Sequence, residues 1–246
     1  MNAAYVQIGS EQLARGMDRS IAGAHGTRPL RATFTPKPFP ELTGSGCHAH
    51  VSLWQRERNL FADRAGELGL SQLGYQFLAG VLGRAEALCA LTNPTVDGHK
   101  RINAAMTLSG ATWSPNTVTY GGNNRTHMIR VPDAGRFELR LADGAANPYL
   151  LQAGLLEAVM DGIASGRDPG ERLDISMYTQ GHTVAGVRRP PLNLNDALRT
   201  FEASTSLGVA LGEEFVRAYV AMKMLEWHDY ASQITAWERE TTLDAR

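Results

Sequence analysis

The sequence contains few cysteines, no long apolar run and no excess of charge of either sign. Its 246 residues include two cysteines, and 24 basic residues nearly balance 25 acidic ones. Two cysteines do not make a disulfide framework, so we expect a reducing, cytoplasmic setting. The balanced charge argues against nucleic acid or a membrane as a partner, and any anion site must be local. No apolar run approaches the roughly 18 residues of a membrane-spanning helix, and the N-terminus lacks the features of a signal peptide.

Periodicity predicts one α+β domain, because helical and strand-like segments follow each other without a repeat or a linker. Helical spacing predicts helices at residues 10–25, 68–91, 147–163, 193–203 and 212–238. Strands are expected at residues 31–35, 47–54, 127–131 and 136–141. Residues 93–124 and 166–192 show little periodicity and are predicted to be irregular. A loop as long as the first of these is often functional.

One of the predicted strands alternates charged and apolar residues, Arg136-Phe137-Glu138-Leu139-Arg140. Successive side chains of a strand point to opposite faces, so the three charged residues share a face that reads plus, minus, plus. Such a face is a poor core. It either faces water, as in many half-buried antiparallel sheets, or holds phosphate oxygens together with a divalent cation.

A second strand carries histidines on one face. His48 and His50 are two residues apart, and Ser52 continues the same face. A neutral imidazole there could bind a divalent metal or donate to a phosphate, although such a pair is also compatible with a structural role. Gly44 and Gly46 precede the strand and would let backbone N–H groups approach an anionic ligand closely.

Arginines gather in the same part of the sequence. Arg101, Arg125, Arg130, Arg136 and Arg140 fall within 40 residues. Arginine suits bidentate recognition of carboxylates and phosphates. The five could be independent surface residues, but one carboxylate among them could hold Mg²⁺ or Mn²⁺ that bridges phosphate oxygens.

Together these motifs resemble the glutamine synthetase family. Residues 44–53, Gly-Ser-Gly-Cys-His-Ala-His-Val-Ser-Leu, are similar to the family's ATP-binding signature. Further blocks follow in the family's order at residues 93–101, 124–132, 136–140 and 146–150. Residues 108–118 resemble the branch called type III glutamate–ammonia ligase or glutamate–methylamine ligase. The similarity runs from about residue 28 to the end of the chain.

The resemblance implies a fold and a reaction. Residues 1–246 would form the C-terminal part of the family's catalytic domain, an antiparallel sheet covered by helices. The family uses ATP to phosphorylate the γ-carboxylate of glutamate, and ammonia or an amine attacks the resulting γ-glutamyl phosphate. Mg²⁺ or Mn²⁺ neutralises the transferring phosphoryl group, so catalysis depends on positioning and electrostatics. A homo-oligomer is expected for a full-length member.

The resemblance also assigns roles to individual residues. His48 and Glu138 would ligate the metal that bridges the ATP phosphates. The nucleotide would be contacted by His50, Ser52, Arg130 and Arg136.

The remaining assignments concern glutamate and the phosphoryl group that it receives. Arg101 and Arg140 would hold the carboxylates of glutamate, and the backbone of Gly44 would lie near its amino end. Arg125 would stabilise the transferring phosphoryl group. Arg125 and Arg101 are the predicted catalytic residues.

One departure from the family pattern concerns the amine. Members that use ammonia carry a glutamate two residues before the proline that aligns with Pro115, and Trp113 stands there in this chain. No acidic residue occurs between Asp97 and Asp133. An indole could hold an alkylammonium through cation–π and apolar contacts. Trp113 is therefore a candidate amine-site residue, and the expected amine is an alkylamine.

A second departure concerns the metal ligands. The family has a β-grasp domain and several metal-binding glutamates upstream of the histidine motif, whereas 47 residues precede His48 here. Glu11 and Glu41 do not lie in similar motifs. We therefore expect that this chain alone does not ligate glutamate. The alternative is an inactive, nucleotide-binding remnant of such a ligase. A guanidino kinase, which has a similar fold, is disfavoured because it needs a reactive cysteine. Cys47 is predicted to lie in the strand after the glycine turn and Cys89 in an apolar helix.

Overall fold

The computed structural model describes residues 4–8, 33–108, 110 and 112–243. Its strands are β1 (Ala4–Ile8), β2 (Ala49–Gln55), β3 (Arg58–Asn59), β4 (Tyr120–Gly121), β5 (Ile129–Asp133) and β6 (Arg136–Leu139). They form one sheet in the order β1-β2-β6-β5-β4, and β3 pairs with the end of β2. All pairs are antiparallel except β4 with β5, which is parallel, so the expected antiparallel sheet is mixed at one edge.

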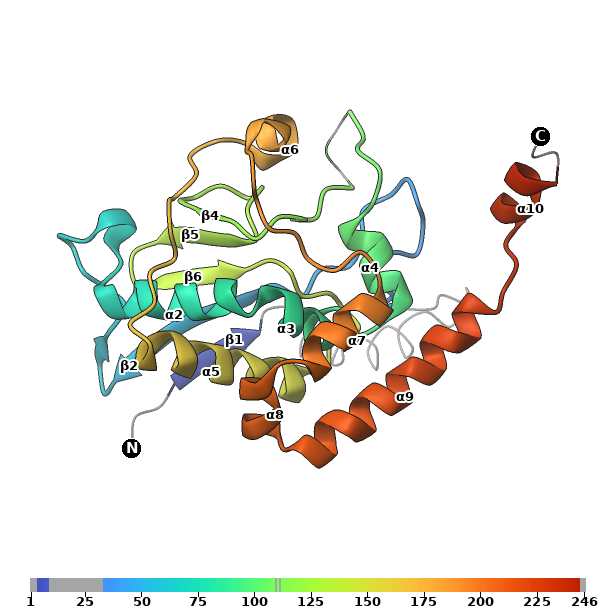
Figure 1. The fold of residues 1–246 in the computed structure, drawn as a ribbon. Coiled ribbons are helices and arrows are strands. Elements are labelled where there is room, and N and C mark those ends of the chain that lie inside the picture. The colour runs from blue at the N-terminus through green and yellow to red at the C-terminus, as the bar shows by residue number, and fades with distance from the viewer. Residues whose placement is uncertain (1–3, 9–32, 109, 111, 244–246) are drawn as a thin grey trace, which may run out of the picture.

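Helices pack against this sheet and against one another. They are η1 (Glu67–Gly69), α2 (Gln72–Gly83), α3 (Ala85–Thr92), α4 (Val96–Ile102), α5 (Pro148–Ala164), α6 (Met177–Gln180), η2 (Gly181–Thr183), α7 (Leu194–Glu202), α8 (Thr205–Leu211), α9 (Glu213–Ala231) and α10 (Ala236–Thr242). Figure 1 shows α2, α3 and α5 across one face of the sheet, with α7 against α3 and α9 against α7. α10 projects from the end of α9. None of the helices in the described part of the chain is both long and apolar enough to cross a membrane.

The core lies between the sheet and these helices. Phe137 and Leu139 of β6 are fully buried, and Ala49 and Val51 of the neighbouring β2 are also buried. The ring of Phe137 stacks on Phe61 at a centroid distance of 6.0 Å, and Phe61 in turn meets Phe77 of α2 edge to face. Since alternate residues of a strand face opposite ways, the charged residues of β6 lie on the side of the sheet away from this core.

The α+β class and the strands predicted at residues 47–54, 127–131 and 136–141 are confirmed, with small shifts in their bounds. Residues 33–35 are irregular rather than part of a strand at 31–35. The predicted helix at 10–25 lies outside the described residues. The helix predicted at 68–91 is two helices, because Arg84 leaves helical geometry (φ −112°, ψ 7°) and joins α2 to α3.

Several short elements were not expected. The predicted loop at 93–124 contains α4, whose first turn is capped by Thr95, and the short strand β4. The region 166–192 contains α6 and η2. The helix predicted at 212–238 ends at Ala231, and α10 follows with its own capping box at Thr235. Short helices of this kind depend on caps and packing and leave little periodicity in a sequence.

Candidate functional site

Glu138 is the point where the polar residues of the sheet meet. Its Oε1 lies 3.1 Å from His48 Nδ1 and 3.8 Å from His50 Nε2. Arg130 Nη1 donates to Oε2 at 2.9 Å, and Arg140 Nη1 donates to Oε1 at 3.1 Å. The residue is only 4% exposed. One buried carboxylate therefore joins two imidazoles and two guanidinium groups.

Strand register explains why residues so distant in sequence meet. β6 lies between β2 and β5, and Glu138 is directly opposite His50 on one side and Arg130 on the other. Directly opposite residues of paired strands have side chains on the same face of the sheet. The next position, Leu139, pairs with Ala49 and Ile129, and all three are buried on the helix side. The alternation thus separates a core face from a charged face.

The surroundings of Glu138 fix the charges in this cluster. Burial alone would raise the pKa of Glu138, but hydrogen bonds with His48 and Arg130 and the charge of Arg140 outweigh it and hold the pKa far below its usual value. Burial lowers the pKa of His48 and of His50. At neutral pH the carboxylate is therefore ionised and both imidazoles are neutral, which are the forms that bind a metal ion.

Arg136 connects the cluster to its exposed edge. Its Nη1 lies 2.9 Å from His50 Nδ1, while Nε and Nη2 donate to the two carboxylate oxygens of Asp133 at 2.7 and 2.6 Å. The Arg136 side chain is 39% exposed. Ser52, on the same face of β2, accepts a hydrogen bond from Trp54 Nε1 at 3.0 Å. Asp133 was not singled out from the sequence.

Arg101 reaches the site from α4 and is almost fully buried. Its Nη1 donates to the carbonyl of Leu141 at 3.0 Å. A Cβ placed on Gly46 would lie 3.0 Å from Arg101 Nη2 and 2.9 Å from His48 Nε2, so the two side chains converge on this glycine. Gly44 lies in the same turn, against the aliphatic part of Arg101. A residue larger than glycine at position 46 would crowd both groups.

The other two predicted site residues lie on loops. Arg125 is exposed, and its carbonyl accepts a hydrogen bond from Arg140 Nε at 3.1 Å. Trp113 is partly buried and meets Tyr178 of α6 edge to face at 5.1 Å. Trp113 Nε1 is buried, and no described residue forms a hydrogen bond with it. Tyr178 was not anticipated from the sequence, because an irregular segment gives no signal for a ring contact across 65 residues.

The donor set that the described residues offer is too small for a complete metal site. His48 and Glu138 offer one nitrogen and a carboxylate on a shared edge, and both are in the form that binds a metal. Across residues 4–8, 33–108, 110 and 112–243, however, no group of three or more histidine, cysteine or acidic residues is arranged to hold a metal ion. Mg²⁺ prefers six oxygen ligands in octahedral geometry. The two residues therefore fit as part of a site.

Asp143 is a buried acid beside the site that the sequence did not mark. It is fully buried, and its carboxylate accepts hydrogen bonds from Asn93 Nδ2 and from the backbone N–H of Ala145, both at 2.9 Å. Burial raises the pKa of Asp143 to about 6, although the nearby Arg101 opposes the shift. Its side chain lies against α4 at Gly98, where a Cβ would come within 2.4 Å of Oδ2.

We expect Asp143 to give stability a distinctive pH dependence. The unfolded chain releases this proton near its usual pKa of 3.8, whereas the folded chain keeps it up to about pH 6. The folded state therefore binds more protons in this window, and the free energy of unfolding falls as the pH rises through it, by about 3 kcal/mol in total. Denaturant titrations between pH 4 and 7 measure this fall in the free energy of unfolding. In Asp143→Asn the fall should be absent. A stability that rises equally in both proteins over this range would contradict it.

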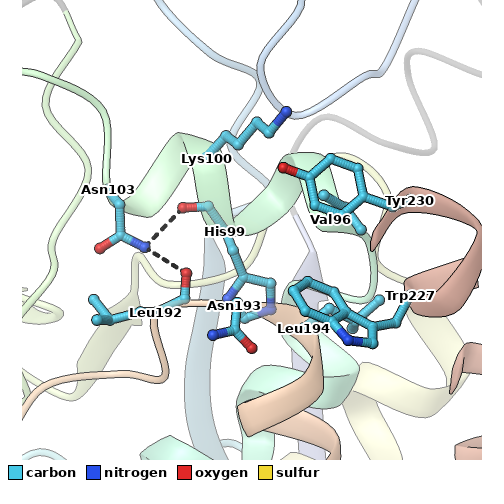
Figure 2. Close-up of a pocket in the computed structure, with 9 residues that line it drawn as sticks. All are labelled: Val96, His99, Lys100, Asn103, Leu192, Asn193, Leu194, Trp227 and Tyr230. Carbon is cyan, nitrogen blue, oxygen red and sulfur yellow. Dashed lines mark hydrogen bonds between the residues drawn. The ribbon is translucent and has the colours of Figure 1, made fainter. Parts of the chain in front are cut away.

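A pocket separate from the Glu138 cluster lies on another face of α4. A cavity of about 270 Å³ is lined by Lys100 of α4, by Asn103 just after this helix, and by Trp227 and Tyr230 of α9 (Figure 2). Lys100 Nζ lies 4.9 Å from the centre of the Tyr230 ring. The Asn103 amide donates to the carbonyls of His99 and Leu192. The pocket lies where α4 packs against α9. The same helix α4 carries Arg101 to the Glu138 cluster.

The amino-acid sequence of the chain matches a known protein family. Residues 7–242 match the family model described as glutamine synthetase, catalytic domain. The chain is 58% identical over 230 residues to a glutamine synthetase of Rhizobium leguminosarum bv. phaseoli, covering 93% of this chain and 52% of that protein. It is 40% identical over 223 residues to a glutamate–methylamine ligase of Methyloversatilis universalis, covering 87% and 49%.

Solved structures agree with these sequence matches. A GmaS/ADP complex matches with a TM-score of 0.86 and 56% identity, over 94% of this chain and 53% of that one. An apo GmaS structure without ligand matches with a TM-score of 0.84 and 54% identity, over 95% and 52%. The chain spans about half the length of the curated relatives that it matches. The family match, the identities and the shared fold together show that the chain belongs to the glutamine synthetase catalytic-domain family.

Proposed function

We propose that this chain supplies one side of the active site of an ATP-dependent ligase that joins ammonia or a small alkylamine to the γ-carboxylate of glutamate through a γ-glutamyl phosphate. The observation that carries the proposal is the convergence of two histidines and two arginines on the buried carboxylate of Glu138. The names of the relatives, glutamine synthetase and glutamate–methylamine ligase, support this reaction class. The matching GmaS/ADP complex supports a nucleotide as ligand.

The nucleotide would lie along the charged face of β2, β5 and β6. Arg136 at the exposed edge, together with Arg130, would contact its phosphates, while His50 and Ser52 would lie beside it. His48 and Glu138 would hold Mg²⁺ or Mn²⁺ as two of several ligands. When bound, such an ion neutralises phosphate charge. The chain's own contribution is to fix positive charge along this face before the reaction begins.

Glutamate would lie at the other end of the same face. Arg101 and Arg140 would hold its carboxylates, and Gly44 would lie near its amino end. Arg101 is suited to this because its guanidinium is held by a backbone carbonyl and points to the glycine turn. Arg125 is exposed on its loop and could reach the phosphoryl group as it is transferred. Positioning two reactants in this way replaces a bimolecular encounter with a nearly unimolecular step.

The isolated chain is expected to bind nucleotide but not to ligate glutamate, because its described residues offer only part of a metal site. A coupled assay for phosphate release with ATP, glutamate, Mg²⁺ and methylamine or ammonia measures this. Activity should be absent for residues 1–246 alone and present when the same residues are part of a full-length relative. Robust turnover by the isolated chain would contradict the proposed division of the site. Nucleotide binding without turnover in both proteins would favour the alternative, an inactive remnant.

The choice of amine is proposed to depend on Trp113. An indole offers a π face and apolar surface to an alkylammonium, and the buried Nε1 of Trp113 has no hydrogen-bond partner among the described residues. In a full-length protein carrying this segment, Trp113→Ala should raise KM for methylamine about 10-fold and leave KM for ATP unchanged. Phe39→Ala, at an exposed aromatic residue, is the control. Equal or better turnover of ammonia, with no effect of Trp113→Ala, would contradict the alkylamine preference.

A further inference from the structure

The side chain of Arg101 is buried, and none of the carboxylates in the described part of the chain forms an ion pair with it. It is 6% exposed, and burial lowers its pKa, which shows how poorly solvated the charge is. Within residues 4–8, 33–108, 110 and 112–243, no ion pair to Arg101 is formed, and Nη1 donates to the carbonyl of Leu141. A buried guanidinium is normally paired. A nearby negative charge that does not form a direct ion pair is therefore expected to balance the charge of Arg101.

Asp143 is the nearby group that can balance this charge. It is fully buried, and the charges of Asp143 and Arg101 act on each other, since each shifts the other's pKa toward the ionised form. Each of its oxygens accepts one hydrogen bond, Oδ2 from Asn93 Nδ2 and Oδ1 from the N–H of Ala145, and these two bonds fix the orientation of the carboxylate. Oδ2 also faces the backbone of α4 at Gly98.

Asn93 links the surroundings of the two charged groups through hydrogen bonds. Its Nδ2 donates both to Asp143 Oδ2 at 2.9 Å and to the carbonyl of Leu141 at 3.0 Å, and this carbonyl is the one that Arg101 Nη1 uses. Its Oδ1 accepts from Thr92 Oγ1 at 2.8 Å, so the amide is fixed in this orientation. Asn93 is fully buried at the C-terminal end of α3. The amide thus connects Asp143 to the carbonyl that Arg101 also uses.

We propose that Asp143 is a restrained counter-ion for Arg101, and that Asn93 is the positioning residue that keeps the two from forming an ion pair. This inference rests on the proposed role of Arg101 as a carboxylate-binding residue. Asp143 stabilises the buried positive charge from a distance, while the hydrogen bonds from Asn93 and Ala145 hold its carboxylate in place. Arg101 therefore keeps its remaining donors for an incoming carboxylate, instead of turning inward. A direct Arg101–Asp143 pair would have to be broken before substrate could bind.

The arrangement makes opposite predictions for its two members. Asn93→Leu keeps the shape of the side chain but frees Oδ2 of Asp143, so Arg101 should pair with it and affinity for L-glutamate should fall about 10-fold. Asp143→Asn removes the competing carboxylate, and affinity should be equal to or higher than that of the unmodified protein. The double variant Asn93→Leu/Asp143→Asn should regain the lost affinity. A purely structural role for Asn93 would make the double variant worse than either single one.

The test uses two measurements on the same set of proteins. Titration calorimetry with L-glutamate gives the affinity, both for the chain and for a full-length protein carrying it. Nitrogen-15 spectra of the arginine side chains report directly whether the Arg101 guanidinium is ion-paired, without any ligand. Thr119→Val, which removes a buried hydroxyl bonded to His127, is the matched control for loss of an internal hydrogen bond. Asn93→Ala replaces the leucine variant if that protein does not fold.

The outcomes separate this inference from the proposed function. An Arg101 resonance typical of an ion pair in the Asn93 variant, absent from the unmodified and double-variant proteins, supports the inference. An unchanged Arg101 signal in the Asn93 variant, or no recovery in the double variant, would overturn it. If the spectra behave as expected but the full-length protein binds no glutamate, the proposed role of Arg101 fails and the restrained counter-ion stands.

Discussion

Phe137→Ala is expected to destabilise the folded chain by about 3–5 kcal/mol, the usual cost of removing a fully buried phenylalanine ring. Phe137 is 0% exposed and stacks on Phe61, which itself packs edge to face on Phe77. The truncation therefore leaves a cavity between the sheet and α2. The free energy of unfolding, measured by denaturant titration, gives the loss directly. A marginally stable domain would be largely unfolded by it.

Phe39→Ala is the control for this prediction, because Phe39 is 55% exposed and its removal leaves no cavity. Its effect should stay within about 0.5 kcal/mol. If Phe137→Ala were as mild as this control, the assignment of Phe137 to the core face of β6 would be wrong. The charged residues on either side of it would then not face the site.

Glu138→Gln, one residue further along the same strand, is expected to weaken Mg²⁺-dependent binding of ADP by about 100-fold or more. Loss of a residue that merely orients a metal ligand typically costs 10–100-fold, and loss of a ligand should cost at least the upper end of that range. The amide also removes the negative charge that two arginines and two histidines surround. Titration calorimetry with ADP, with and without Mg²⁺, measures the effect.

Glu67→Gln provides a matched control, since Glu67 is an exposed carboxylate paired only with Arg172 among the described residues. It should leave ADP affinity unchanged. Circular dichroism at the temperature of the titration establishes that the Glu138 variant remains folded. An ADP affinity that is equally high in the Glu138 and Glu67 variants would contradict the proposed metal-binding role of Glu138.

The period of two in residues 136–140 was enough to predict both faces of β6. It placed Phe137 and Leu139 on one side and Glu138 on the other, and the structure confirms this separation. The resemblance to glutamine synthetases, stated from the motifs at residues 44–53 and 136–140, is confirmed by the family match. The roles given to the site residues remain predictions, although His48, His50, Arg130 and Glu138 do lie together.

The sequence could not predict contacts that depend on tertiary packing. α4 is a single short helix in a segment without periodicity, and its existence depends on the Thr95 cap and on packing against α9. The network of Asn93, Asp143 and Arg101 joins segments up to 50 residues apart through a shared carbonyl. Nothing in the local pattern distinguishes Asp143 from a surface acid, because its burial follows from the approach of α4.

The most direct test of the account is to find where a metal–nucleotide complex binds on this chain. Mn²⁺ broadens the NMR signals of nearby nuclei, so addition of Mn²⁺ with ADP should broaden the imidazole signals of His48 and His50. The exposed His182 and His228 should keep sharp signals. Glu138→Gln should abolish the selective broadening. Broadening of His182 or His228 instead, or selective broadening that survives in the Glu138 variant, would contradict a nucleotide and metal site on the charged face of β2 and β6.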